Sequence, residues 1–113
     1  MIVDPDLQEQ AQLAESLHRL YPAAEANCFI DPLLALKYGF GNPVDALYAP
    51  VKMKRIGGFE LGKLLRKSHP QIALHFIGDD RQEETDAMRL MADSYILRPV
   101  TSEKLKQSEA AEW

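Results

Sequence analysis

Basic side chains gather where a short apolar run ends, and this stretch is where the sequence could do chemistry. "ALYAPVKMKRIGG", at positions 46–58, begins like a buried strand and ends like a turn, with Pro50 at the junction. Three cations follow within four residues, namely Lys52, Lys54 and Arg55. They could hold an anion or pair with a carboxylate, but the stretch after Pro50 has no hydroxyl, thiol or carboxylate nucleophile. The pattern therefore indicates electrostatic rather than covalent chemistry.

Other reactive residue types are scattered along the chain. No two of His18, His69 and His75 stand at metal-ligand spacing, so no metal site is predicted. His75, between two apolar residues, is expected to be a packed strand residue, with pH sensing as the alternative. Cys28 is the single cysteine, which excludes an internal disulfide, and its apolar setting predicts a buried thiol. The acidic run "GDDRQEETD" (78–86) could bind a cation, but it is expected to cap and solvate a helix.

Bulk composition points to one globular domain. The chain has 113 residues, of which 46% are hydrophobic and 27% charged, a balance typical of a single folded core. A net charge of −4 argues against direct binding of nucleic acid. No window is long and apolar enough for a membrane helix, and the N-terminus does not resemble a signal peptide. We therefore expect a cytoplasmic domain that does not contact a membrane.

Short apolar runs alternate with longer segments of helical period. Strands are predicted at 1–3, 25–30, 45–49, 71–77 and 94–97. Helices are predicted at 4–21, 31–39, 58–68, 81–92 and 102–113. Asp-Pro pairs at 4–5 and 31–32 are expected to start the first two helices, because Asp caps and Pro suits the first turn. The apolar face of the first helix is predicted from residues at three- or four-residue intervals: Leu7, Ala11, Ala14, Leu17 and Tyr21.

Strands that are apolar on both faces suit a parallel sheet covered by helices on each side. Because crossovers between parallel strands are right-handed, the expected architecture is α/β, a doubly wound three-layer sandwich. In such sheets the functional crevice lies beyond the carboxyl ends of the strands. Here those ends fall at 3–4, 30–31, 49–50, 77–78 and 97–98.

The spacing of several segments resembles a bacterial two-component response-regulator receiver domain. The segments are "IVDPD" after the first strand, "MKRIGGFEL" after the third and "YILRPV" at the fifth. The resemblance spans Ile2 to about Leu105 and is nearest to receivers that regulate transcription in gut Firmicutes. It implies a flavodoxin-like (βα)5 fold with strand order 2-1-3-4-5. In that family a partner histidine kinase transfers a phosphoryl group to an aspartate at the end of the third strand, and carboxylates near it hold Mg²⁺.

In this chain most residues at the positions of the phosphorylation pocket differ from the family pattern. Counting back eight residues from Gly58 puts Pro50 at the phosphoacceptor position, which supplies no nucleophile. The acidic pair is reduced to Asp4-Pro5, and Gly78 stands where the family has Thr or Ser. Arg98 replaces a Lys, which keeps the charge and changes its geometry. The resemblance thus implies a vestigial pocket in which Mg²⁺ binding is lost or weak.

The resemblance also implies roles for residues outside the pocket. Tyr95 stands where the family has an aromatic residue that swings between outward and inward rotamers, although an ordinary strand aromatic is the alternative. Receiver-like domains commonly pair through the face of the fourth helix, fifth strand and fifth helix, and Met88 and Met91 are expected, with Tyr95, on or near that face. Arg98-Pro99 is expected to be cis. Gly57-Gly58 is expected to supply positive φ in a turn.

The basic loop has two interpretations. Lys52 or Lys54 could fold back onto Asp4 and supply permanently the charge that a metal would supply. The alternative is that both lysines are solvated loop charges.

The leading functional hypothesis is a non-enzymatic pseudo-receiver, 1–113, that works by protein–protein interaction without Asp phosphorylation or any cofactor. It would form a homodimer through the face of the fourth helix, fifth strand and fifth helix. It would be the N-terminal part of a longer transcription regulator, with a DNA-binding output domain after Trp113. One alternative is a sensor of a small anion or nucleotide that uses Lys52, Lys54 and Arg98. The last is phosphotransfer to an unorthodox acceptor, for which the candidates are Asp45, Asp79 and Asp80.

Overall fold

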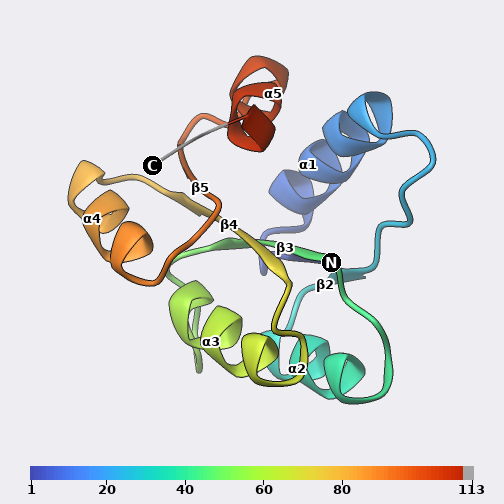
Figure 1. Ribbon diagram of the computed structural model, residues 1–113. Coiled ribbons are helices and arrows are strands. Elements are labelled where there is room, and N and C mark those ends of the chain that lie inside the picture. Colours follow the sequence, from blue (N-terminus) through green and yellow to red (C-terminus); the bar gives the residue numbers. More distant parts are fainter. Residues whose placement is uncertain (111–113) are drawn as a thin grey trace.

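A computed structural model describes residues 1–110 and contains one five-stranded parallel sheet between helices (Figure 1). The strand order is β2-β1-β3-β4-β5, which confirms the predicted fold class. The strands are β1 (Ile2–Val3), β2 (Cys28–Phe29), β3 (Ala46–Pro50), β4 (Ala73–Gly78) and β5 (Ser94–Leu97). The helices are α1 (Leu7–Leu20), α2 (Pro32–Gly41), α3 (Gly58–Ser68), α4 (Arg81–Arg89) and α5 (Ser102–Ala110). The predicted end of the last helix, at 111–113, lies outside the described residues.

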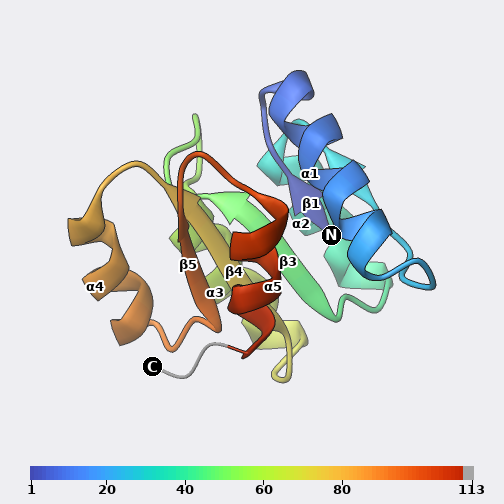
Figure 2. The same cartoon turned by 90° about the horizontal axis from the view of Figure 1, so that it is seen from above.

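Helices cover both faces of the sheet. α1 and α5 contact each other on one face, while α2 and α3 contact each other on the opposite face (Figures 1 and 2). α4 packs against β4 and β5. Because side chains alternate along a strand, β3 sends Leu47 and Ala49 to the α2–α3 face and Tyr48 to the α1–α5 face. The sheet therefore separates two apolar cores.

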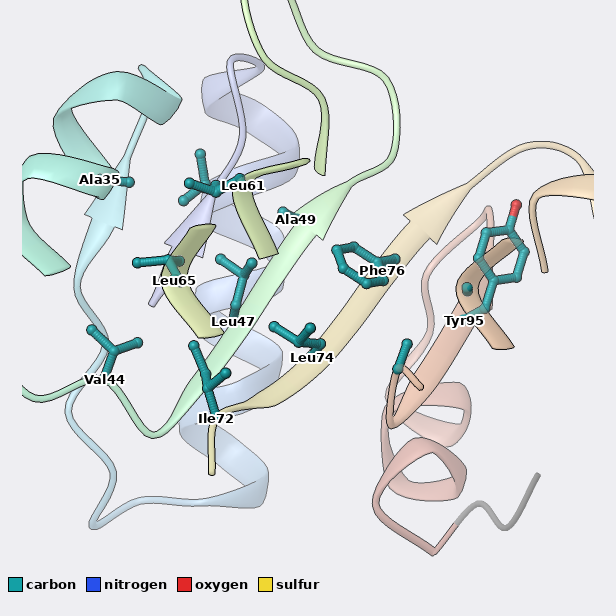
Figure 3. Packing of buried hydrophobic residues seen from close by; sticks show 13 residues of the cluster. Ala35, Val44, Leu47, Ala49, Leu61, Leu65, Ile72, Leu74, Phe76 and Tyr95 are labelled. Atoms are coloured by element: carbon teal, nitrogen blue, oxygen red, sulfur yellow. The ribbon is translucent and has the colours of Figure 1, made fainter. Parts of the chain in front are cut away.

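Phe76 is the largest fully buried side chain of the core on the α2–α3 face (Figure 3). Phe59 of α3 packs edge-on against it, with ring centroids 4.8 Å apart. α3 can come this close because Gly62 has no side chain: a Cβ there would stand 2.9 Å from Phe76 Cζ. Truncating a buried aromatic of this kind costs about 3–5 kcal/mol.

The opposite core contains a buried polar pair among apolar side chains. His75 Nδ1 and Ser94 Oγ are hydrogen-bonded at 2.7 Å, and both residues are almost fully buried. The His75 ring stacks on Tyr48, with centroids 4.4 Å apart. The expectation that His75 is a packed strand residue is confirmed.

The start of α1 differs from the prediction. Its N-cap is Asp6, whose carboxylate accepts from the N–H groups of Gln8 and Glu9, rather than Asp4. The helix therefore begins at Leu7, and separately its buried face differs from the predicted one. Leu13 is buried and Leu17 packs beside it, while Leu7 and Ala11, both predicted to face inward, are exposed. Asp4 is thereby left free of a capping role.

Cys28 is exposed, so the prediction of a buried thiol is wrong. β2 is an edge strand of only two residues, and its neighbour on the inner side is β1. The apolar run around Cys28 therefore borders the sheet instead of crossing its middle. Ile30, at the end of the same run, is likewise exposed.

Candidate functional site

Four predicted pocket residues lie at the carboxyl ends of β1, β3, β4 and β5. Asp4 follows β1, Pro50 ends β3, Gly78 ends β4 and Arg98 follows β5. Because all five strands are parallel, these ends meet at one edge of the sheet. Pro5, the remaining position of the predicted pocket, is exposed.

Asp4 is a buried carboxylate, 4% exposed. Its Oδ1 accepts from the Asp6 N–H at 2.9 Å, which fixes the turn between β1 and α1. Burial raises the pKa of Asp4 above its ordinary value, and the nearby charge of Glu9 adds to this. The Asp6 hydrogen bond and the Arg98 charge act in the opposite direction and do not cancel the rise. Asp4 is therefore held in a setting that disfavours its charged form.

Pro50 is buried and pairs with Ile77 in the ladder between β3 and β4. On the other side of β3, Tyr48 donates its N–H to Met1 O at 2.9 Å, so the next donor toward β1 would be residue 50. Proline has no N–H, and the pairing of β1 with β3 ends at Tyr48. The residue beside Asp4 thus contributes neither a side-chain oxygen nor a backbone donor.

Arg98 carries the positive charge of this site. Its Nη1 donates to Asp79 Oδ2 at 2.8 Å, and its Nη2 lies 3.2 Å from Glu9 Oε2. Burial lowers the pKa of Arg98, but the hydrogen bond to Asp79 and the charges of Glu9, Asp79 and Asp4 outweigh it and leave the pKa raised. The guanidinium is thus permanently charged and already shared between two carboxylates. Its Nε is buried without a partner among the described residues.

These residues do not fit a divalent cation. Mg²⁺ takes several oxygens in octahedral geometry, but Pro5 and Pro50 offer no side-chain oxygen and Asp6 is used to cap α1. Arg98 stands beside the remaining carboxylate, Asp4. Within residues 1–110, no group of three or more His, Cys, Asp or Glu side chains is disposed to hold a metal ion.

The lysines of the basic loop after β3 lie at the surface. Lys52 and Lys54 are both exposed, and the cation whose charge acts on Asp4 is Arg98. Arg55 Nη1 lies 3.2 Å from Asp31 Oδ2, at the start of α2, which holds the loop toward that helix. Arg98 thus acts on Asp4 here, and the pairing of Lys52 or Lys54 with Asp4 stays a prediction.

Backbone strain in this loop falls on Arg55 and not on the glycines. Arg55 has φ 73°, and Ile56 N–H donates to Lys54 O across it, which forms a γ-turn of the rare, strained kind. Gly57 and Gly58 have no positive φ, so that expectation is wrong. Gly58 is needed instead because a Cβ there would overlap the carbonyl oxygen of Pro50.

Tyr95 is 9% exposed and lies on the same side of the sheet as Phe76 (Figure 3). Its hydroxyl oxygen is bonded to the backbone of Asp80, at 2.7 Å from the carbonyl oxygen and 3.2 Å from the nitrogen. It also lies 3.1 Å from Glu83 Oε1. Tyr95 is therefore directed inward beneath α4, and its side chain is not displayed to a partner.

Met88 and Met91 do lie at the surface, and Met91 is 80% exposed. Met91 has φ 61° in the turn that ends α4, where Ala92 N–H donates to Ala87 O and Met91 N–H to Met88 O. This Schellman pattern favours glycine at the Met91 position. Arg66 of α3 is half-buried and donates to the carbonyls of Leu90 and Met91 at 2.6 and 3.2 Å.

The unorthodox acceptor candidates are separated in space. Asp45 precedes β3 and so lies at the amino end of the sheet, beside a cavity of about 640 Å³ far from the predicted pocket. Asp79 pairs with Arg98, and Asp80 caps α4 by accepting from Gln82 N–H at 2.8 Å. The expectation that this acidic run caps α4 is confirmed.

Sequence reasoning did not predict the two carboxylates that pair with Arg98. Glu9 and Asp79 share Arg98, although they lie on α1 and after β4. The signal for Asp79 was available, since an acidic pair directly follows the fourth strand at the edge where Arg98 was expected. Glu9 gave no such signal, because its position depends on where α1 begins.

No family model and no curated protein matches the chain. Solved structures do match. A response-regulator receiver domain protein from Clostridium thermocellum is 18% identical with a TM-score of 0.84, covering 96% of this chain and 88% of that one. An uncharacterized protein from Neptuniibacter caesariensis is 25% identical with a TM-score of 0.84, covering 97% and 85%. The fold is that of a response-regulator receiver domain.

A longer solved structure with the receiver fold is also similar. Response regulator DrrB from Thermotoga maritima, described as an OmpR/PhoB homologue, is 18% identical with a TM-score of 0.79. The match covers 92% of this chain and 46% of DrrB. In residues 1–110 no helix is long and apolar enough to cross a membrane.

Proposed function

We propose that this chain is a non-enzymatic signalling domain with the receiver fold, acting through protein contacts and without aspartate phosphorylation. The observation that carries the proposal is Pro50, buried at the end of β3 where the resemblance puts the phosphoacceptor. An acyl phosphate requires a carboxylate, and neither Pro50 nor its neighbours Ala49 and Val51 has one. We also propose that the domain is cytoplasmic and uses no cofactor.

Arg98 supports the same proposal from the electrostatic side. In the family, the charge of the pocket changes when metal and phosphate bind. Here a guanidinium that cannot be deprotonated stays beside Asp4 and bridges Glu9 and Asp79. A pocket that already holds a permanent cation has less to gain from Mg²⁺.

The test is incubation with acetyl phosphate and Mg²⁺, followed by intact-mass measurement, with a phosphorylatable receiver domain as the positive control. We expect no mass gain in this chain under conditions that modify the control. A gain of one phosphoryl group would refute the proposal. Loss of that gain in Asp45→Asn, Asp79→Asn or Asp80→Asn would then identify the acceptor.

The proposed partners are proteins: a second copy of this chain through the α4–β5–α5 face, and a DNA-binding output domain following 1–113 in a longer regulator. Exposed Met88 and Met91 support the first, and the similarity to part of DrrB supports the second. Light scattering after size exclusion should give a dimer for the natural chain and a monomer for Met91→Glu. Leu7→Glu, which changes another exposed apolar residue, on α1, is the control. A natural chain that stays monomeric at high concentration would contradict the homodimer.

A small-anion or nucleotide sensor is the second candidate, and it has less support. The cavity beside Arg98 has a volume of about 130 Å³, and its lining also includes Asp4 and Glu9, which would repel an anion. Thermal shift against a panel of anions and nucleotides separates the candidates. A rise in melting temperature that disappears in Arg98→Met would favour the sensor.

A further inference from the structure

α2 lies beside the edge strand β2 and exposes one side of an apolar helix. Of its ten residues only Lys37 is charged, and a helix that is apolar all round is ordinarily buried. Phe40 is 72% exposed, and Leu33 and Leu34 are exposed as well. The helical period puts positions 33, 37 and 40 on one side of α2, with position 34 next to them. We call Leu33, Leu34, Lys37 and Phe40 the α2 surface.

The packing of α2 on α3 turns this surface outward. Gly39 approaches α3 so closely that a Cβ there would stand 2.5 Å from Leu65 Cδ2. His69 Nε2, just after α3, lies 2.9 Å from Asn42 O, just after α2. Ala35, on the same side of the helix as Gly39, is fully buried. Because this side of α2 is fixed against α3 and the core, the other side faces solvent.

Cations are concentrated in the segments next to the α2 surface. Between residues 31 and 72 lie seven of the 13 Lys and Arg residues of the chain, but only three of its 17 Asp and Glu residues. α2 and α3 contact each other, and the pair between Arg55 and Asp31 holds the loop after β3 toward α2. This region is therefore basic, although the net charge of the chain is −4.

The lysines of this region have no carboxylate partner. Within residues 1–110, no ion pair is formed by the exposed lysines of α2, the loop and α3, which are Lys37, Lys52, Lys54, Lys63 and Lys67. By contrast, the arginines of α1 and α4 pair with carboxylates of their own helices. Unpaired cations beside exposed apolar side chains are complementary to a partner that is both acidic and apolar.

We propose that the α2 surface is a docking site for an acidic amphipathic helix of a partner protein. Leu33 and Phe40 are two turns apart, about 10 Å, so the apolar stripe matches the i, i+3, i+4 and i+7 positions of one helix. Carboxylates beside those positions would meet Lys37 and the lysines of the loop and of α3. This goes beyond the proposed function, because α2 lies at the β2 edge of the sheet and the α4–β5–α5 face at the other edge (Figure 1). The two surfaces can be occupied at once.

The same observations favour a protein over a nucleic acid or a membrane. Exposed leucine and phenylalanine side chains have no role on a phosphate backbone, which is bound by polar and charged groups. A flat anionic bilayer would also approach exposed Glu25, just before β2, and Asp31, at the start of α2, and would repel both. A single helix needs to contact only the apolar stripe and the lysines beside it.

NMR with a designed peptide tests the proposal. The probe is a helix of about 18 residues, or five turns, with leucine along one face and glutamate elsewhere, titrated into the 15N-labelled chain. We expect saturable shifts at the amides of α2, of the loop after β3 and of α3, and an affinity that falls about tenfold between about 0.05 and 0.5 M salt. The matched peptide with lysine in place of glutamate should not bind. Equal binding of both peptides, shifts confined to other elements, or no shift of α2 would overturn the proposal.

Variants of the α2 surface separate specific docking from general attraction. Phe40→Ser and Lys37→Glu should each weaken peptide binding about tenfold, since one removes the exposed anchor and the other reverses the central charge. Both side chains are exposed, so the melting temperature should change little. Arg19→Glu, a charge reversal at an exposed position of α1, is the matched control and should leave the affinity unchanged. If it weakens binding as much as Lys37→Glu, the attraction is not specific to α2.

Other occupants give different results. Self-association that Phe40→Ser abolishes would identify a second copy of this chain as the occupant and overturn the proposal. Cosedimentation with phosphatidylserine vesicles, or a shift of duplex DNA, would also overturn it if the acidic peptide does not bind. None of these measurements depends on acetyl phosphate or on Met91. A mass gain with acetyl phosphate would therefore refute only the proposed function, and failure of the peptide to bind would refute only this docking site.

Discussion

Replacing Arg98 by methionine removes the charge from the strand-end site and keeps most of the aliphatic stem. The guanidinium pairs with Asp79 at 2.8 Å and Glu9 at 3.2 Å, and its own side chain is 27% exposed. Exposed pairs contribute about 0.2–1 kcal/mol each, and partial burial puts these two in the upper half of that range. Buried Asp4 also loses its favourable cation. We expect Arg98→Met to lower the free energy of unfolding by about 1–2 kcal/mol at pH 7.

Urea denaturation followed by circular dichroism measures this loss, which corresponds to a fall of about 1 M in the midpoint. The effect should shrink at about pH 3, where carboxyl groups are largely protonated, and in about 1 M salt. Arg55→Met is the matched control, since it removes one exposed pair with Asp31 and should cost less. The reasoning fails if Arg98→Met costs no more than Arg55→Met at pH 7, or if its cost is the same at both pH values.

Three further results are expected. The pKa of Asp4 is raised in the folded state, so its ionisation destabilises the fold once pH rises above the ordinary pKa value of 3.8. In urea titrations Asp4→Asn should therefore be more stable than the natural chain at pH 7 but not at pH 3. Equal gains at both pH values would contradict this. Met91→Gly should raise the free energy of unfolding by about 1 kcal/mol, because Met91 has φ 61°, and a loss would show that its side chain packs. Cys28 should react with a thiol reagent in native buffer as fast as in urea, and protection would place it in an interface.

Local signals in the sequence predicted several elements closely. α3 spans Gly58–Ser68 and β5 spans Ser94–Leu97, as the apolar periodicity indicated. Asp31 caps α2 as predicted, since capping depends only on neighbouring residues. The Arg98-Pro99 bond is cis, as the resemblance implied. The start of α1 was misassigned because Asp4 and Asp6 are both good caps, and its apolar face was misassigned because Leu7 and Ala11 fit the helical spacing although the sheet covers Leu13 and Leu17 instead.

The sequence by itself determined which chemistry the strand ends lack, because Pro50 and Gly78 have no functional side chain in any fold. It also determined the alternation of strands and helices, which short-range periodicity encodes. Only the tertiary structure decided which cation acts on Asp4, since Arg98 reaches it through the order of β1, β3, β4 and β5. Likewise, only the register of β4 with β5 brings the Tyr95 hydroxyl over Gly78. Contacts of this kind join residues distant in the chain, and no local pattern carries them.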